Sequence, residues 1–146
     1  MRYFDTSFVA PLILEEAASS KVERFIAGLP AGELAVSHWT RVEFSSLLAR
    51  EVRMGGLEQQ AAREADAQFE ATVQESFIVL APGSDDFDLA RAYLGNYSTG
   101  LRAGDALHLA IAANHAVEAI YSLDKTLLKA GMTLGLPVSM GIRIAR

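Results

Sequence analysis

The sequence contains no cysteine, which excludes disulfide bridges, zinc–thiolate sites and thiol catalysis. It also has no uninterrupted apolar run that approaches the ~20 residues needed to cross a bilayer. The first residues reach the charged Asp5 almost at once, so the apolar stretch of a signal peptide is missing. We therefore expect a cytoplasmic protein without a membrane segment.

Positive charge is also scarce. The chain carries 13 Lys and Arg against 18 Asp and Glu, for a formal net charge of −5. Because binding to phosphates relies on Lys and Arg, the net charge alone argues against a nucleic-acid partner. Carboxylates that bind metal are offset once the cations arrive, however, and basic residues can gather on one rim. The charge balance therefore does not decide the partner.

Apolar residues are plentiful. Of the 146 residues, 51% are hydrophobic and 21% are charged, which is enough to bury a core and excludes a disordered chain. The length suits one domain, predicted over 1–146, without internal repeats or linkers.

Short apolar segments alternate with helical patterns. The segments alternate poorly between apolar and polar residues, as expected for a sheet covered on both faces. Strands that alternate with helices indicate an α/β fold with a parallel sheet. The predicted strands are 2–4, 33–37, 77–81, 119–123 and 136–140, and the predicted helices are 7–15, 19–29, 38–54, 57–75, 87–94, 105–116 and 125–130, the last ending at Gly131.

Two aspartates directly follow predicted strands. Asp5 comes after 2–4 and Asp124 after 119–123. The carboxyl ends of parallel strands form the edge where such sheets place their sites. Each aspartate could instead serve as a helix N-cap, a role that Asp fills well.

Two further acids lie in predicted helices. Glu43 shares one helix face with Trp39 and Leu47, and a carboxylate in an apolar stripe is costly unless it is paired or binds metal. The structural alternative is a buried ion pair, for example with Arg102. Asp105 opens an apolar helix beside small residues that allow close approach, although it too could be an N-cap.

Together the four acids suggest a metal site. Carboxylates that converge on one edge repel each other and raise their pKa values, and divalent cations relieve this repulsion. Hard oxygen ligands favour Mg²⁺ or Mn²⁺ over zinc. Such a site activates water and stabilises charge on a phosphoryl group, which is the chemistry of phosphodiester hydrolysis.

The motifs around these acids resemble the PIN-domain family and, within it, the VapC-type toxins of type II toxin–antitoxin systems. The resemblance rests on four segments and covers nearly the whole chain. They are Phe4-Asp5-Thr6-Ser7, Arg41-Val42-Glu43-Phe44, the run from Gly104-Asp105 to Ala110, and Ser122-Leu123-Asp124 followed by Leu127 and Gly131.

The resemblance implies a three-layer fold whose parallel sheet of about five strands has the order 3-2-1-4-5 and is flanked by helices. It implies a metal-dependent endoribonuclease that acts on tRNA or ribosomal RNA as a homodimer and is inhibited by a cognate antitoxin. Within the family pattern, Asp5 and Asp105 hold the metal, while Glu43 and Asp124 complete the site. Ser122 would orient Asp124 or a metal-bound water, and Thr6 and Ser7 would act similarly near Asp5.

Other functions fit less well. An aspartyl phosphatase usually has a second Asp two residues after the nucleophile, where this chain has Ser7. A receiver domain would require paired acids at the first strand and a Lys after the last. A non-catalytic PIN-like binding module, for RNA or a partner protein, is the alternative from another class. His108 is interpreted as a packed, hydrogen-bonded histidine, since metal-bound hydroxide makes a histidine base unnecessary.

Overall fold

A single parallel sheet lies at the centre of the computed structural model, which describes residues 1–144. Residues 145 and 146, the end of the predicted domain, lie outside the described residues. The sheet order β3-β2-β1-β4-β5 confirms the expected order 3-2-1-4-5. The strands are β1 (Arg2–Phe4), β2 (Leu34–Ser37), β3 (Ile78–Leu80), β4 (Ala119–Tyr121) and β5 (Val138–Ser139).

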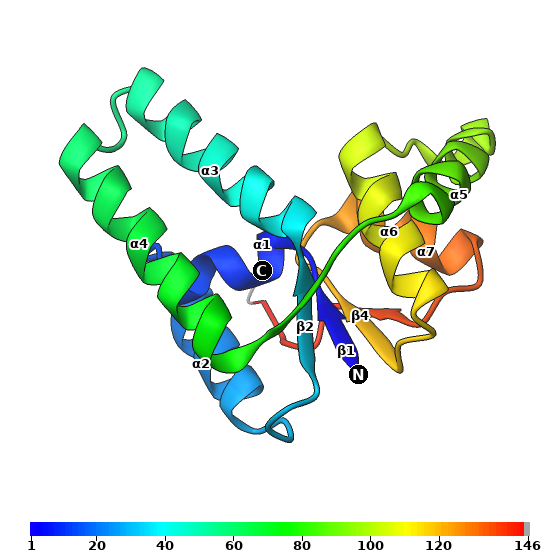
Figure 1. Cartoon of the computed structure of the whole chain (residues 1–146), viewed down its shortest axis with the longest axis horizontal. Coiled ribbons are helices and arrows are strands. Elements are labelled where there is room, and N and C mark those ends of the chain that lie inside the picture. The colour runs from blue at the N-terminus through cyan, green and yellow to red at the C-terminus, as the bar shows by residue number, and fades with distance from the viewer. Residues whose placement is uncertain (145–146) are drawn as a thin grey trace.

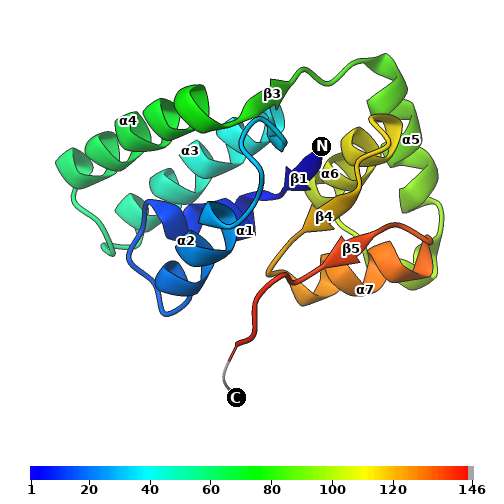
Figure 2. The same ribbon diagram turned by 90° about the horizontal axis from the view of Figure 1, so that it is seen from below.

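Helices cover both faces of this sheet (Figures 1 and 2). The chain builds outward from β1 to β3, then crosses to the other side of β1 for β4 and β5, which places the two sets of right-handed crossovers on opposite faces. One layer comprises α1 (Thr6–Val9), η1 (Ala10–Leu12), α2 (Ser19–Ala27), α3 (His38–Arg53) and α4 (Gln59–Ser76). The other comprises α5 (Ser84–Leu94), η2 (Tyr97–Thr99), α6 (Ala103–Asn114) and α7 (Lys125–Thr133).

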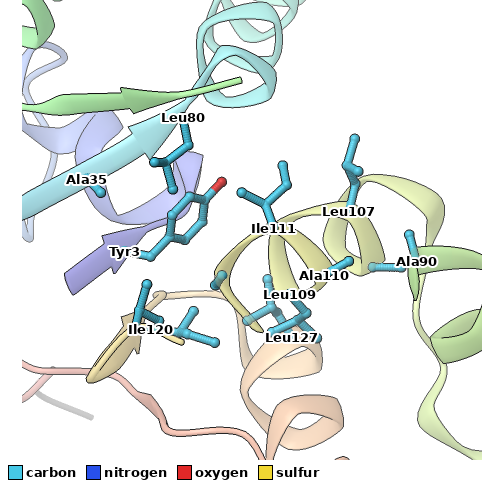
Figure 3. Packing of buried hydrophobic residues seen from close by; sticks show 13 residues of the cluster. Tyr3, Ala35, Leu80, Ala90, Leu107, Leu109, Ala110, Ile111, Ile120 and Leu127 are labelled. Atoms are coloured by element: carbon cyan, nitrogen blue, oxygen red, sulfur yellow. The ribbon is translucent and has the colours of Figure 1, made fainter. Parts of the chain in front are cut away.

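Each helical layer packs on its own hydrophobic core. Successive side chains of a strand point to opposite faces, so Tyr3 belongs to the core under α6 and Phe4 to the core under α1 and α3. Figure 3 shows the Tyr3 ring beside Leu80 and Ile111. Both Tyr3 and Phe4 are fully buried, so β1 is the central strand in packing as well as in pairing.

Several predicted helix boundaries differ from the structure, and two of the differences have a clear physical reason. The helix expected over 7–15 ends as α1 at Val9 and continues only as a short 3-10 turn, because Pro11 cannot donate the hydrogen bond that an α-helix requires. The last helix continues past Gly131, where a Cβ atom would approach Val138 Cγ1 to 2.3 Å. Gly131 therefore allows α7 to pack closely on β5, and the turn follows at Gly135, whose φ is +75°.

Within residues 1–144, none of the helices combines the length and apolarity needed to cross a membrane.

Candidate functional site

The four predicted acids lie at the carboxyl ends of β1 and β4 and on the two helices next to them. Asp5 immediately follows β1, and Asp124 is the N-cap of α7 shortly after β4. The two strands are parallel neighbours, with Phe4 paired to Tyr121, so their ends meet. This is the point where the sheet reverses its strand order, the usual position of sites in open α/β sheets.

Asp5 is buried and held by three hydrogen bonds. Its Oδ1 accepts from Ser7 Oγ at 2.8 Å and from the Phe8 amide at 3.1 Å, and its Oδ2 accepts from Ser122 Oγ at 2.7 Å. Burial raises the pKa of Asp5, against the opposing effects of the His108 charge and of these three donors. Asp5 is thus both an N-cap and a fixed carboxylate. Oδ1 already accepts two hydrogen bonds, whereas Oδ2 accepts one and retains a lone pair for a cation.

Serine hydroxyls connect the ends of β1 and β4. Ser122 Oγ donates to Asp5 and accepts from the Asp124 amide at 3.0 Å, while Ser7 Oγ accepts from the Leu123 amide at 2.9 Å. The Ser122 hydroxyl therefore orients the Asp5 carboxylate. Its bond to Asp124 is to the backbone amide of that residue and not to the carboxylate. Ser7 supports Asp5 as the sequence suggested.

Glu43 is held at one of its two oxygens. Thr6 Oγ1 donates to Glu43 Oε1 at 2.6 Å, and His108 Nε2 is hydrogen-bonded to the same oxygen. Thr6 thus supports Glu43 and not Asp5. Burial raises the pKa of Glu43, but the hydrogen bond and charge of His108 and the bond from Thr6 outweigh it, so the pKa lies below its usual value.

The second oxygen of Glu43 lies over a glycine. A Cβ atom on Gly104 would approach Glu43 Oε2 to 2.9 Å and the Trp39 ring to 3.3 Å. Trp39 Nε1 donates to the Gly104 carbonyl at 3.2 Å, which fixes the start of α6 against α3. The small residues around Asp105 were expected to let another group approach closely, and the groups that approach Gly104 are the side chains of Glu43 and Trp39.

Asp105 carries the clearest sign that the four acids share one region. It lies in the first turn of α6, whose N-cap is Arg102, so Asp105 is not the N-cap. Burial raises its pKa to about 6, and the charges of Asp124, Asp5 and Glu43 add to this rise while His108 opposes it. An acidic residue at a helix start is favoured by the helix dipole, so the raised pKa reflects the surrounding acids and burial.

Asp124 caps α7 with one oxygen. Its Oδ1 accepts from the Thr126 amide at 2.8 Å and from the Leu127 amide at 3.1 Å. No described residue donates a hydrogen bond to Oδ2. The capping role that the sequence left open is real, and it leaves one oxygen of Asp124 for another partner.

The donors fit a divalent cation chemically but are not gathered around a single point. Across residues 1–144, no group of three or more His, Cys, Asp or Glu side chains is placed to hold a metal ion. Carboxylate oxygens are nevertheless the ligands that Mg²⁺ and Mn²⁺ prefer, and the repulsion on Asp105 is the kind that a cation relieves.

Sequence reasoning missed one buried pair and its support. The partner of Glu43 is His108, not Arg102, and His108 Nδ1 lies 2.7 Å from Tyr3 Oη. Burial lowers the pKa of His108, but the Tyr3 oxygen and the carboxylates of Glu43 and Asp5 raise it to about 10. The sequence held only part of the signal, because a histidine on an apolar helix needs a buried hydrogen-bond partner, but no local spacing identifies Tyr3 and Glu43 as its partners.

Comparison with known families gives one match. The family model described as "PIN domain" matches residues 2–131, which is most of the chain. A comparison with curated proteins found no match.

Several solved structures share this fold. VapC20 from Mycobacterium tuberculosis, described as a sarcin–ricin loop cleaving toxin, is 23% identical with a TM-score of 0.71, and the match covers 90% of this chain and 95% of that one. FitAcB from Neisseria gonorrhoeae is 16% identical with a TM-score of 0.74, over 97% of this chain and 98% of that one. PAE2754 from Pyrobaculum aerophilum is 22% identical with a TM-score of 0.63, and the match covers 88% of this chain and 78% of that one. At these identities the likeness concerns the fold.

Proposed function

The chain belongs to the PIN-domain family, and from this premise we propose that it is a metal-dependent endoribonuclease, the toxin of a type II toxin–antitoxin pair. PIN domains are typically nucleases that use divalent metals. The observation that carries the proposal is the placement of the four acids: Asp5 and Asp124 follow the paired strands β1 and β4, and Glu43 lies over Gly104, beside Asp105. The raised pKa of Asp105, to which the other three charges contribute, supports it. The similar fold of a toxin that cleaves an RNA loop favours ribosomal or transfer RNA as the substrate.

The four acids would have two different roles, metal binding and orientation of the attacking water. Mg²⁺ or Mn²⁺ would be held by Asp5 and Asp105. Asp5 is fixed by Ser7 and Ser122, and the charge of Asp105 is unfavourable without a counter-ion. When bound, the cation supplies a Lewis acid for the phosphoryl oxygens and lowers the pKa of a water. Glu43 and Asp124 each keep one oxygen without a donor from the described residues, so they would orient the attacking water.

The reaction is an in-line displacement at phosphorus. Asp124 Oδ2 would accept the proton of the attacking water, while Oδ1 remains bound to the amides of Thr126 and Leu127 and fixes the side chain. A bond forms between the water oxygen and phosphorus, and the bond to the ribose oxygen breaks. The leaving oxygen then takes a proton from solvent.

A cognate antitoxin and a second copy of the chain are the proposed protein partners. The hairpin of α3 and α4 carries a groove of about 480 Å³ whose walls include Leu48, Val52 and Ala62. An amphipathic antitoxin helix would lay its apolar side in such a groove. Failure of the purified chain to bind any co-encoded protein would contradict this part of the proposal.

Cleavage of total cellular RNA tests the function. We expect discrete fragments from the purified chain with Mg²⁺ or Mn²⁺, and none with chelator or with Asp5→Asn. The matched control is Asp88→Asn, an exposed acid on α5, which should cleave like the wild type. Cleavage that survives in Asp5→Asn would point to a contaminating nuclease and contradict the assignment of Asp5. If the wild type binds RNA without cutting it, the non-catalytic binding module becomes the better description.

A further inference from the structure

A chain of buried hydrogen bonds runs across the sheet and ends on Glu43. Ser37 Oγ on β2 lies 2.9 Å from Tyr3 Oη on β1, and Tyr3 Oη lies 2.7 Å from His108 Nδ1 on α6. His108 Nε2 is bonded to Glu43 Oε1. Ser37, Tyr3 and His108 are at most 1% exposed, so none of these three side chains can exchange its partner for water.

The direction of the last bond follows from its acceptor. Glu43 carries a carboxylate, whose oxygens accept hydrogen bonds, and His108 Nε2 is bonded to its Oε1. His108 Nε2–H is therefore the donor, and Thr6 Oγ1 donates to the same oxygen at 2.6 Å. Both donors hold Oε1. Oε2 receives no bond from a described residue and lies over Gly104.

The surroundings give no packing reason for these polar groups. Tyr3 lies in the core under α6 with Ile111, Leu109 and Ile120, and apolar side chains of similar volume would fill the same space. Replacing a buried polar network by well-packed apolar residues is often neutral or stabilising. The network therefore fits a positional task at its outer end. There Glu43 Oε2 lies over Gly104, the residue before Asp105, and Oε1 accepts a bond from Thr6, the residue after Asp5.

We propose that Tyr3 and His108 are positioning residues, which lock Glu43 Oε1 so that Oε2 faces the cation and the attacking water. The inference rests on the proposed metal-dependent function of the four acids. Mutation of a side chain that orients a metal-binding carboxylate commonly lowers metal affinity or activity about 10- to 100-fold, because the carboxylate loses its fixed orientation.

The test compares isosteric variants of the full chain. Tyr3→Phe removes only the hydroxyl, and Tyr121→Phe is the matched control, since no described residue is hydrogen-bonded to the Tyr121 hydroxyl. We expect Tyr3→Phe to weaken Mn²⁺ binding, measured by calorimetry, about tenfold and to lower kcat with an unchanged KM for RNA. The control should stay within about twofold of the wild type, inside the scatter of such context-dependent effects.

Two further variants separate positioning from general stability. His108→Gln keeps an N–H donor that reaches Glu43, so it should bind Mn²⁺ more tightly than His108→Leu. In the Glu43→Gln background, Tyr3→Phe should cause no additional loss of Mn²⁺ affinity, because it acts through Glu43. Fully additive losses, or equal affinities for the two His108 variants, would overturn the proposal.

The outcomes also distinguish this inference from the function on which it rests. If Glu43→Gln weakens Mn²⁺ binding and Tyr3→Phe does not, the positioning role fails and the metal site stands. If Glu43→Gln binds Mn²⁺ like the wild type, Glu43 has no part in metal binding and the positioning proposal is contradicted, whereas the metal site of Asp5 and Asp105 stands. If Tyr3→Phe does not fold, the pair of His108 variants and the Glu43 background decide the question.

Discussion

The metal-free protein should gain stability when Asp105 is neutralised. Burial, Asp124, Asp5 and Glu43 raise the pKa of this carboxyl from 3.8 to about 6. At ~1.4 kcal/mol per pKa unit, keeping the group ionised costs roughly 3 kcal/mol. Because Asp105 is partly exposed, solvent screening reduces this cost, and Asn also loses a favourable contact with the helix dipole. We expect Asp105→Asn to gain about 1 kcal/mol at pH 8.

The pH dependence gives the sign of the effect. A carboxyl group with a raised folded-state pKa contributes stability below its unfolded value of 3.8, and this contribution is lost as pH rises through about 6. The gain in Asp105→Asn should therefore be full at pH 8 and shrink by about half at pH 5. Urea unfolding in chelator at both pH values measures it, with Asp88→Asn as the control. A loss of stability at pH 8, or a gain that does not change with pH, would refute the reasoning.

Substitutions at three other positions probe the site and the core. Gly104→Ala would bring a methyl group against Glu43 Oε2, so RNA cleavage should fall about tenfold, while urea unfolding changes by less than about 1 kcal/mol; unchanged cleavage would contradict this close approach. Asp124→Asn keeps an N-cap and should lose cleavage without loss of stability, whereas Asp124→Ala should also cost about 1 kcal/mol; equal stability of the two variants would rule out the cap. Phe69→Ala removes the ring that stacks on Phe44 at 4.1 Å and should cost about 3 to 5 kcal/mol in urea unfolding, against less than 1 kcal/mol for a surface position.

The sequence predicted the sheet well because its strands are buried on both faces. Short apolar segments bounded by polar residues are sufficient to locate such strands, and the observed β1 matches its predicted bounds. The strand order came from the family resemblance, and the pairing confirms it. Helix ends were predicted less well. The end of α1 before Pro11 was readable from the sequence, because proline lacks the N–H group, and it was overlooked. Gly131 instead acts through the close packing of α7 on β5, which no local pattern reveals.

The candidate site was predicted as a set of acids but not as a network. The positions of Asp5 and Asp124 follow from strand ends, which a sequence reveals. The contacts of His108 with Tyr3 and Glu43 join segments far apart in the chain, so no local spacing could predict them. Likewise, Ser122 at the end of β4 donates to Asp5 at the end of the neighbouring strand β1, whereas the sequence placed Ser122 only beside Asp124.

Calorimetric titration of Mn²⁺ into the wild type and Asp105→Asn tests the central claim most directly. We expect saturable binding to the wild type and at least about tenfold weaker binding to the variant, because Asp105 would be both a ligand and the carboxyl group whose repulsion the cation relieves. Asp88→Asn should bind like the wild type. Equal Mn²⁺ affinity for the wild type and Asp105→Asn, or no saturable binding to the wild type, would contradict the claim that these acids form a metal site.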